Sequence, residues 1–372
     1  MAEQDTPHSH PSAAAAAGQG ALAGLRVIDM ASLYAAPLAA TIMADFGADV
    51  VKVEPPEGDL FRDSKMWPIV ARGKECLALD LRSAEGIAAF KRLVAGADVI
   101  VENYPAAVLE KRGLGWDTLS AINPRLIMLS VSCFGGTGPY SERPGSGTIG
   151  EGFGGLTWLM GEGGGPPMLP SVALGDAVGA MSAVIGVLSA LYWRERSGIG
   201  QRIDASLYEP ILQIVAHAAQ RWTPGASPER CGSKLPGVLR NVYATADGRF
   251  VAISASTARH RADLVALAGM GEGDDDAPVA RWIAGQDQAG LIATLVARRI
   301  PVAPVNSLDE LLADPHVRSR GSLVHVESPD LGDLALAAPS PILSATPGRI
   351  GEVNPPLGRD ADALIARWSA DR

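Results

Sequence analysis

The stretch LRVIDMASLYAAPLAATIMADFGADVVKVE, residues 25–54, decides the fold. Residues 25–30 form a short apolar run typical of a buried strand, and residues 35–46 have the alanine-rich pattern of a helix. A second apolar strand is predicted at 49–54, where a Pro-Pro pair ends it. The order of strand, helix and strand predicts a unit whose two strands are parallel.

The same alternation continues along the chain. Residues 77–81 lead into a helix at about 84–95, and apolar strands are predicted at 97–103 and 126–131. Repeated alternation of strands and helices is typical of an α/β protein with a mostly parallel sheet and helices on both faces. Ligands of such sheets bind beyond the carboxyl ends of the strands.

Composition restricts the kinds of partner that we expect. The chain has 372 residues, of which 47% are hydrophobic and 20% charged, and its formal net charge is -9. This length suffices for two domains. No block of Lys and Arg offers a surface to nucleic acid or to an anionic membrane. We therefore expect a small-molecule substrate, no nucleic-acid partner and no membrane partner.

The cysteines and the N-terminal residues indicate the compartment. Cys76, Cys133 and Cys231 are widely spaced and form no C-x-x-C pair, so neither a disulfide framework nor a metal site is predicted. Residues 1–23 are rich in Ala, Ser and Pro and lack the regions of a signal peptide, so they predict a disordered tail. We expect a cytoplasmic protein.

One acid stands at the beginning of a long apolar segment. Asp176 precedes residues 177–193, which carry no charge, and RERSGIGQ closes the segment at 194–201. About 20 apolar residues would span a bilayer, but this segment is shorter and rich in small residues, so it predicts a packed core helix. An Asp at this place is commonly just a helix N-cap. It is also where a carboxylate can be held ionised and directed at a substrate, which makes Asp176 the candidate functional centre.

Familiar catalytic motifs offer no better candidate. GEGFGG at 150–155 matches the G-x-G-x-x-G dinucleotide fingerprint, yet it follows RPGSG rather than a strand, and the Gly and Pro residues behind it cannot continue a helix. We therefore expect no NAD site. The sequence also has no G-x-S-x-G elbow, no H-E-x-x-H pair and no Walker loop.

Short motifs in a fixed order carry a resemblance to a known family. They are GLRVID (24–29), ADFGADVVKVE (44–54), LDLR (79–82), ADVIVENY (97–104), GD (175–176), RSGIGQ (196–201), RNVY (240–243), IPVAPVN (300–306) and PPLG (355–358). As an ordered series they make the chain resemble the class III CoA-transferases, or CaiB/BaiF family, over roughly residues 24–365.

The resemblance implies a particular domain organisation. A large Rossmann-like, CoA-binding domain would span 24–200, a linker helix 201–225 and a smaller α/β domain 226–320, with 321–372 returning to the large domain. The family also implies an interlocked homodimer, in which two subunits thread through each other. The smaller domain is abbreviated near residues 271–288.

The resemblance further implies that Asp176 is the nucleophile of a CoA-transferase. The matching aspartate of the family attacks an acyl-CoA thioester to give a mixed anhydride. The CoA thiolate then forms an aspartyl-CoA thioester, and an acceptor carboxylic acid finally takes the CoA. Acyl-CoA and a small carboxylic acid would be the substrates, with no permanently bound cofactor and no metal. A carboxylate is a poor nucleophile in water, and desolvation with a CoA-anchored substrate would make it competent.

A set of residues matches family positions that line the CoA groove. It comprises Tyr34, Ala35, Leu79, Arg82, Asn103, Tyr104, Lys111, Ser132, Cys133, Phe134 and Gly135. A cation in this set would face phosphate, and an aromatic ring would face adenine. The chain departs from the family at residues 75–76 and 105–107, so Lys111 and Arg112 would share the role of the family's usual arginine. Alternatively, the cations form a solvated charged face.

Two other functions stay open. An α-methylacyl-CoA racemase-like enzyme would remove the α-proton with a His and an Asp, but residues 146–152 contain no histidine where such relatives carry one. A non-catalytic CoA-binding homologue would have no need of the carboxylate of Asp176.

Substrate choice is expected to depend on the loops at 160–171 and 230–239 and on the smaller domain. A dicarboxylate is expected if Lys234 or Arg240 faces the site.

Overall fold

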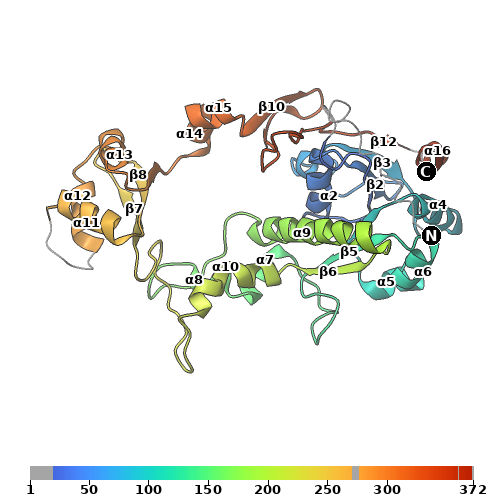
Figure 1. Cartoon of the computed structure of the whole chain (residues 1–372), viewed down its shortest axis with the longest axis horizontal. Coiled ribbons are helices and arrows are strands. Elements are labelled where there is room, and N and C mark those ends of the chain that lie inside the picture. Colours follow the sequence, from blue (N-terminus) through green and yellow to red (C-terminus); the bar gives the residue numbers. More distant parts are fainter. Residues whose placement is uncertain (1–19, 270–275, 359, 371–372) are drawn as a thin grey trace, which may run out of the picture. The chain divides into compact units, whose positions relative to one another are not determined.

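Seven parallel strands form the central sheet of the protein (Figure 1). The computed structural model describes residues 20–269, 276–358 and 360–370, so most of the predicted N-terminal tail, residues 1–19, lies outside the described residues. In their order across the sheet, the strands are β12 (Leu357–Gly358), β3 (Lys74–Ala78), β2 (Asp49–Glu54), β1 (Arg26–Asp29), β4 (Val99–Glu102), β5 (Ile127–Ser132) and β6 (Arg202–Ser206). All neighbouring pairs are parallel. The predicted α/β fold with a mostly parallel sheet is confirmed.

Helices cover both faces of this sheet, because successive residues of a strand point to opposite sides. In β1, Val27 belongs to the core beneath α2 and α9, whereas Ile28 belongs to the core beneath α4 and α16. The helices of this part are α2 (Ala35–Asp45), α3 (Trp67–Val70), α4 (Ala84–Ala95), α5 (Ala106–Lys111), α6 (Trp116–Ile122), α7 (Gly147–Phe153), α9 (Leu174–Ser197), α10 (Glu209–Ala219) and α16 (Ala361–Ala370), whereas α8 (Leu156–Leu159) belongs almost wholly to the smaller unit described below. The helices predicted at 35–46 and about 84–95 are α2 and α4.

Helix α9 is the apolar helix that the sequence predicts. Among the described residues it is the one helix long and apolar enough to cross a membrane, judged by length and composition alone. It packs against α2, α7, β5 and β6, and Ala180, Ala183 and Val187 are buried in the core there. The helix begins at Leu174, ahead of the predicted start, and ends at Ser197. The C-cap residue Gly198 has a φ of 73°, the left-handed conformation typical of that position.

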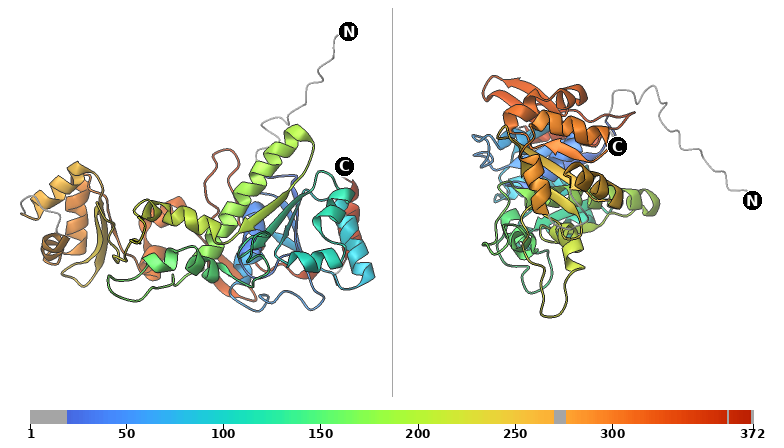
Figure 2. Two further views of the ribbon diagram at one scale, coloured as in Figure 1. Left: turned by 90° about the horizontal axis from the view of Figure 1, so that it is seen from below. Right: turned by 90° about the vertical axis from the view of Figure 1, so that its left-hand side faces the viewer.

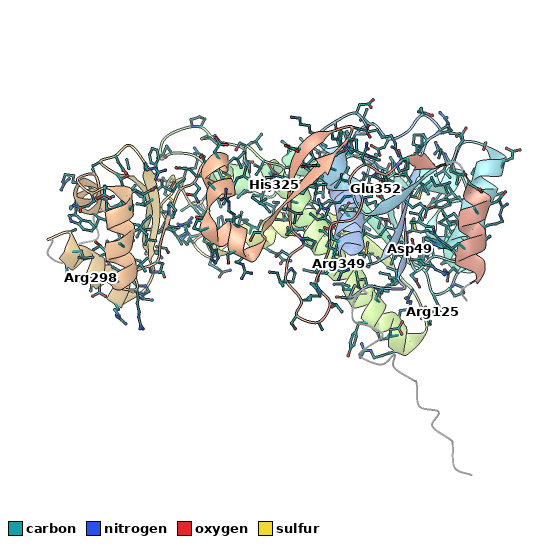
Figure 3. All side chains as sticks on the ribbon, turned by 90° about the horizontal axis from the view of Figure 1, so that it is seen from above. Asp49, Arg125, Arg298, His325, Arg349 and Glu352 are labelled. Carbon is teal, nitrogen blue, oxygen red and sulfur yellow. The ribbon has the colours of Figure 1, made fainter. Side chains whose placement is uncertain are left out.

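The C-terminal residues complete the sheet. Strand β12 pairs with β3 at the sheet edge, and α16 packs on α4. Ahead of β12, the backbone N–H of Arg349 donates to Asp45 O and that of Gly73 donates to Glu352 O, both at 2.8 Å. Figure 3 labels Arg349 and Glu352 in this returning segment and Asp49 at the start of β2. An antiparallel hairpin, β10 (Leu323–Ser328) and β11 (Gly332–Ala337), precedes the segment.

The chain divides into two compact units. The smaller unit holds residues 157–169 and 218–320, and the larger holds the rest. The family resemblance predicts that residues 157–169 belong to the large domain. These residues instead join the smaller unit because Trp158 Nε1 donates to Pro228 O at 3.2 Å, and Arg230 Nη1 donates to Trp158 O at 3.1 Å.

An antiparallel sheet with helices packed on it forms most of the smaller unit (Figure 2). The strands are β7 (Leu239–Ala244), β8 (Phe250–Ala255) and β9 (Val302–Pro304); the helices are α11 (Ala258–Leu267), α12 (Asp276–Ile283), α13 (Gln288–Ala297), α14 (Leu308–Ala313) and α15 (Pro315–Arg320). Within the predicted abbreviated segment, residues 271–275 lie outside the described residues. This unit has its own apolar core, which includes Val251, Leu264 and Leu295.

A buried cluster of charges connects the first three strands of the large sheet. Asp29 is fully buried, and its Oδ2 lies 2.8 Å from Lys74 Nζ and 3.7 Å from Lys52 Nζ. Asp29 Oδ1 accepts the Ala31 N–H, and Lys52 Nζ donates to Ala31 O. Burial acts to raise the pKa of Asp29, but the two ammonium groups hold that pKa below its ordinary value. The cluster thereby fixes the turn that leads from β1 toward Tyr34.

Candidate active site

The carboxyl ends of β1 and β4 mark the point where the strand order reverses. From β1 the chain continues to β2 and β3 on one side, whereas β4 and β5 lie on the other side. The two loops are hydrogen-bonded to each other, because Ser32 N–H donates to Asn103 Oδ1 at 3.0 Å and Asn103 Nδ2 donates to Ser32 O at 2.8 Å. Open α/β sheets bind their ligands at such a point.

Asp176 lies in the first turn of α9, where the positive end of the helix dipole favours a carboxylate. Its side chain is half-buried. The N-cap residue is Ala173, so the interpretation of Asp176 as the helix N-cap is wrong. The helix starts earlier because one of its free N–H groups, that of Gly175, donates to Glu151 Oε1 at 2.7 Å. The Asp176 carboxylate is therefore not needed to cap the helix.

Two groups on α7 determine the surroundings of the Asp176 carboxylate. The Gly147 backbone N–H donates a hydrogen bond to it, and Glu151 places a second negative charge nearby. Burial raises the pKa of Asp176, and the Glu151 charge raises it further, while the Gly147 hydrogen bond opposes both. A raised pKa makes the carboxylate more basic and hence a better nucleophile.

Two of the residues predicted to line a CoA groove lie within electrostatic range of Asp176. Burial raises the pKa of the Tyr34 hydroxyl; the Asp176 charge adds to that effect and Arg72 opposes it. Burial and the Asp176 charge likewise raise the pKa of the Cys133 thiol. Both side chains therefore stay neutral near pH 7. Ala35, also predicted, is the buried first residue of α2 beside Tyr34.

The other predicted groove residues follow the strands of the same sheet. They are Leu79 and Arg82 after β3, Asn103 and Tyr104 after β4, Lys111 on α5, and Ser132, Phe134 and Gly135 at the end of β5. Arg82 is held by Asp80, with 2.8 Å between Nε and Oδ1, and Lys111 is exposed. Within the described part of the chain, no contact joins either cation to Asp176. Arg82 and Lys111 therefore contribute no contact to the carboxylate.

Aromatic rings gather around Phe134. Tyr140, Phe153 and Tyr208 contact it, with ring centroids 5.7, 5.2 and 6.5 Å from that of Phe134. The guanidinium of Arg143 lies 3.6 Å from the centroid of the Tyr140 ring. Such a cluster can accept an aromatic base or an apolar chain by ring contacts.

Sequence reasoning missed Gly147 and Glu151 as site residues. It considered their surroundings only as a dinucleotide fingerprint, whereas the structure folds 147–153 into the short helix α7, which a loop and not a strand precedes. One feature of the sequence could have pointed to Glu151 as a site residue, because it is the one charged residue in the stretch 144–161.

Comparisons with known proteins identify the family of the chain. The model of CoA-transferase family III matches residues 22–361. The chain is 38% identical to the beta subunit of succinyl-CoA–L-malate CoA-transferase from Chloroflexus aurantiacus, over 92% of this chain and 93% of that one. It is 36% identical to succinyl-CoA–D-citramalate CoA-transferase from the same organism, over 90% of each. The crystal structure of a CaiB/BaiF family protein from Brucella suis has a TM-score of 0.81 and 30% identity, over 94% of this chain and 100% of that one.

The chain therefore belongs to CoA-transferase family III, as its motifs indicated. It is an enzyme that moves CoA from an acyl-CoA thioester to a carboxylic acid.

Gly147 leaves room for the Asp176 carboxylate, and we expect Gly147→Ala to lower kcat about 100-fold or more. An added Cβ would lie 2.3 Å from Asp176 Oδ2 and 2.5 Å from its backbone nitrogen, so the carboxylate must move. Steady-state CoA-transfer kinetics measure the loss, and circular dichroism checks the fold. Gly152→Ala on the same helix is the control, because its Cβ meets no atom within 4 Å. An equal loss of kcat in Gly147→Ala and Gly152→Ala would contradict the idea that catalysis depends on the position of the Asp176 carboxylate.

Proposed function

We propose that Asp176 carries the CoA transfer as a covalent nucleophile. One of its carboxylate oxygens attacks the thioester carbonyl carbon, the C–S bond breaks, and the CoA thiolate leaves a mixed anhydride. The thiolate then attacks the aspartyl carbonyl carbon and releases the donor acid, which leaves an aspartyl-CoA thioester. The acceptor carboxylate repeats these two steps in reverse, so that a new acyl-CoA forms and Asp176 is again a carboxylate.

The observation that supports this proposal most is the setting of Asp176. It is a half-buried carboxylate in the first turn of α9, hydrogen-bonded to the Gly147 N–H and not needed as a cap. Partial desolvation offsets the weak nucleophilicity of a carboxylate, and an anchored CoA tail would supply the proximity.

The predicted groove residues would anchor that tail. The exposed Lys111 is a cation suited to a phosphate, and the rings around Phe134 suit the adenine or the acyl group. The contacts of Tyr34, Asn103 and Cys133 with the ligand remain a proposal. Tyr34 and Asn103 follow the two strands at the switch point of the sheet, and Cys133 lies within electrostatic range of Asp176.

Mass spectrometry tests the covalent step. The enzyme is incubated with a panel of acyl-CoA thioesters, quenched with hydroxylamine or borohydride, and digested. Modification of the peptide that holds Asp176 supports the proposal, and the best donor begins to define the substrate. An unmodified enzyme that exchanges α-protons with deuterated water would replace the proposal with a racemase-like function.

We further propose that the acids exchanged are small dicarboxylates. The names of the relatives mention succinyl-CoA, malate and citramalate, all of which carry a second carboxylate.

A comparison of acceptor acids tests this specificity. We expect KM for butyrate, which lacks the second carboxylate, to exceed KM for succinate about 10-fold or more, because a charge-assisted hydrogen bond to that carboxylate is missing. Equal KM values for the two acids would exclude recognition of the second carboxylate.

The interlocked homodimer also remains a proposal. Its support is an exposed apolar stripe on α9, where Met181, Ile185, Leu188 and Tyr192 are 57%, 66%, 42% and 67% exposed. Light scattering of the full chain gives the mass, and a monomer at micromolar concentration would contradict the dimer. The cytoplasmic location is likewise a proposal, tested by cell fractionation and supported by the packing of α9 on the sheet.

A further inference from the structure

Glu151 is an unusual carboxylate for its position. It lies on α7 and is only 1% exposed. Its Oε1 accepts the Gly175 N–H at 2.7 Å, and within the described part of the chain no cation forms an ion pair with it. Burying a carboxylate without a cation is unfavourable. The burial of the Glu151 carboxylate therefore requires an explanation other than packing.

The packing of α7 on α9 brings Glu151 to the residue that precedes Asp176. A Cβ on Gly175 would lie 2.5 Å from Gly147 O and 3.1 Å from Glu151 Cγ, so the two helices meet in close contact at this point. Gly147 binds the Asp176 carboxylate, and Glu151 binds the Gly175 backbone. The first turn of α9 is thus held from one side by two residues of one short helix.

We propose that Glu151 is a positioning residue that fixes the first turn of α9 and, through its own negative charge, makes the free Asp176 carboxylate less favourable than its acylated form. This inference rests on the proposed function of Asp176. In the mixed anhydride and in the aspartyl-CoA thioester, Asp176 carries no charge. The repulsion from Glu151 is present only in the free enzyme and disappears when the acyl group is attached.

The groups around this pair agree with such a role. Tyr34 and Cys133 lie within electrostatic range of Asp176 and are neutral near pH 7. Arg72 is the cation that acts electrostatically on Tyr34. Its Nε donates to Asp45 Oδ1 at 3.0 Å, and its Nη2 donates to Asp45 Oδ2 at 2.7 Å. The charge of Glu151 is therefore not cancelled by an adjacent ion pair.

Glu151→Gln separates the charge from the hydrogen bond, because a side-chain amide oxygen can still accept the Gly175 N–H. Attack requires the ionised form of Asp176. Since the Glu151 charge raises the pKa of Asp176, its removal should lower that pKa and move the acid limb of kcat/KM to lower pH. We also expect kcat to fall about 10-fold with KM little changed. The fraction of enzyme trapped as aspartyl-CoA thioester with succinyl-CoA should fall as well.

Two further variants complete the experiment. Glu151→Ala also removes the hydrogen bond, so its kcat should lie below that of Glu151→Gln. Glu195→Gln removes an exposed charge from the far end of α9 and should leave the pH profile and the trapped fraction as in the wild type. Thermal unfolding of each variant confirms that the fold is intact.

The outcomes distinguish this inference from the proposed function. If wild-type enzyme shows no modification of Asp176 with succinyl-CoA or any other donor, the covalent function itself fails. If the wild type is modified and Glu151→Gln leaves both the acid limb and the trapped fraction unchanged, the charge of Glu151 has no role. The inference is supported if Glu151→Gln moves the acid limb of kcat/KM to lower pH and reduces the fraction of enzyme trapped as aspartyl-CoA thioester. A purely structural residue would change kcat without moving the pH profile.

Discussion

Replacing Asp176 by Asn is expected to lower kcat for CoA transfer at least about 1,000-fold, because an amide cannot attack the thioester. The fold should remain intact. The folded-state pKa of Asp176 lies above its ordinary value, so its ionisation opposes folding above the unfolded pKa. Asp176→Asn removes this penalty, and its melting temperature near pH 7 should equal or slightly exceed that of the wild type. Kinetics and thermal unfolding of the same samples measure both effects.

The controls for Asp176→Asn separate chemistry from binding. CoA binding, measured by calorimetry, should persist, because the predicted groove residues are unchanged. Asp117→Asn removes an exposed acid from the first turn of another helix, α6, and should leave kcat unchanged. If Asp176→Asn retained more than about a tenth of the wild-type kcat, another residue would have to form the covalent bond.

Asp29→Asn is expected to lower the free energy of unfolding by about 3–5 kcal/mol at pH 7, because it leaves the buried ammonium group of Lys74 without its carboxylate, whereas Lys52 keeps Asp59 at 3.0 Å. Asp29 and Lys52 are each 0% exposed, and Lys74 is 4% exposed. Losing Asp29 removes the largest interaction that favours the charged form of Lys74, whose pKa burial already lowers to about 8. Urea unfolding measured by circular dichroism gives the free energy.

The pH dependence of this loss follows from the lowered pKa of Asp29. Its stabilising contribution is complete above the unfolded pKa of 3.8 and is lost as the pH falls through the lower folded-state value. The difference between Asp29→Asn and wild type should therefore shrink in acid. Asp362→Asn breaks an exposed ion pair with Arg92 and should cost at most about 1 kcal/mol. Equal losses in the two variants would mean that burial of the Asp29 cluster has no energetic consequence.

The parallel sheet and its covering helices could be predicted from local patterns. Apolar runs at 25–30 and 49–54 become β1 and β2, and the helix of 84–95 is reproduced as α4. These patterns can be recognised in the sequence because a strand buried on both faces needs consecutive apolar residues, and this requirement does not depend on which elements pack against it. The pairing of β12 with β3 was not predicted, because a two-residue strand has no periodicity and is defined only by its partner.

The sequence by itself determined the family, the α/β fold and the place of Asp176 at the start of an apolar helix, since each depends on neighbouring residues or on ordered motifs. Only the tertiary structure decided what surrounds that carboxylate. Glu151 and Gly175 are far apart in the chain, and they meet because α7 packs on α9. Burial, a hydrogen bond from Gly147 and a neighbouring charge set the reactivity of Asp176, and all three arise from contacts through space.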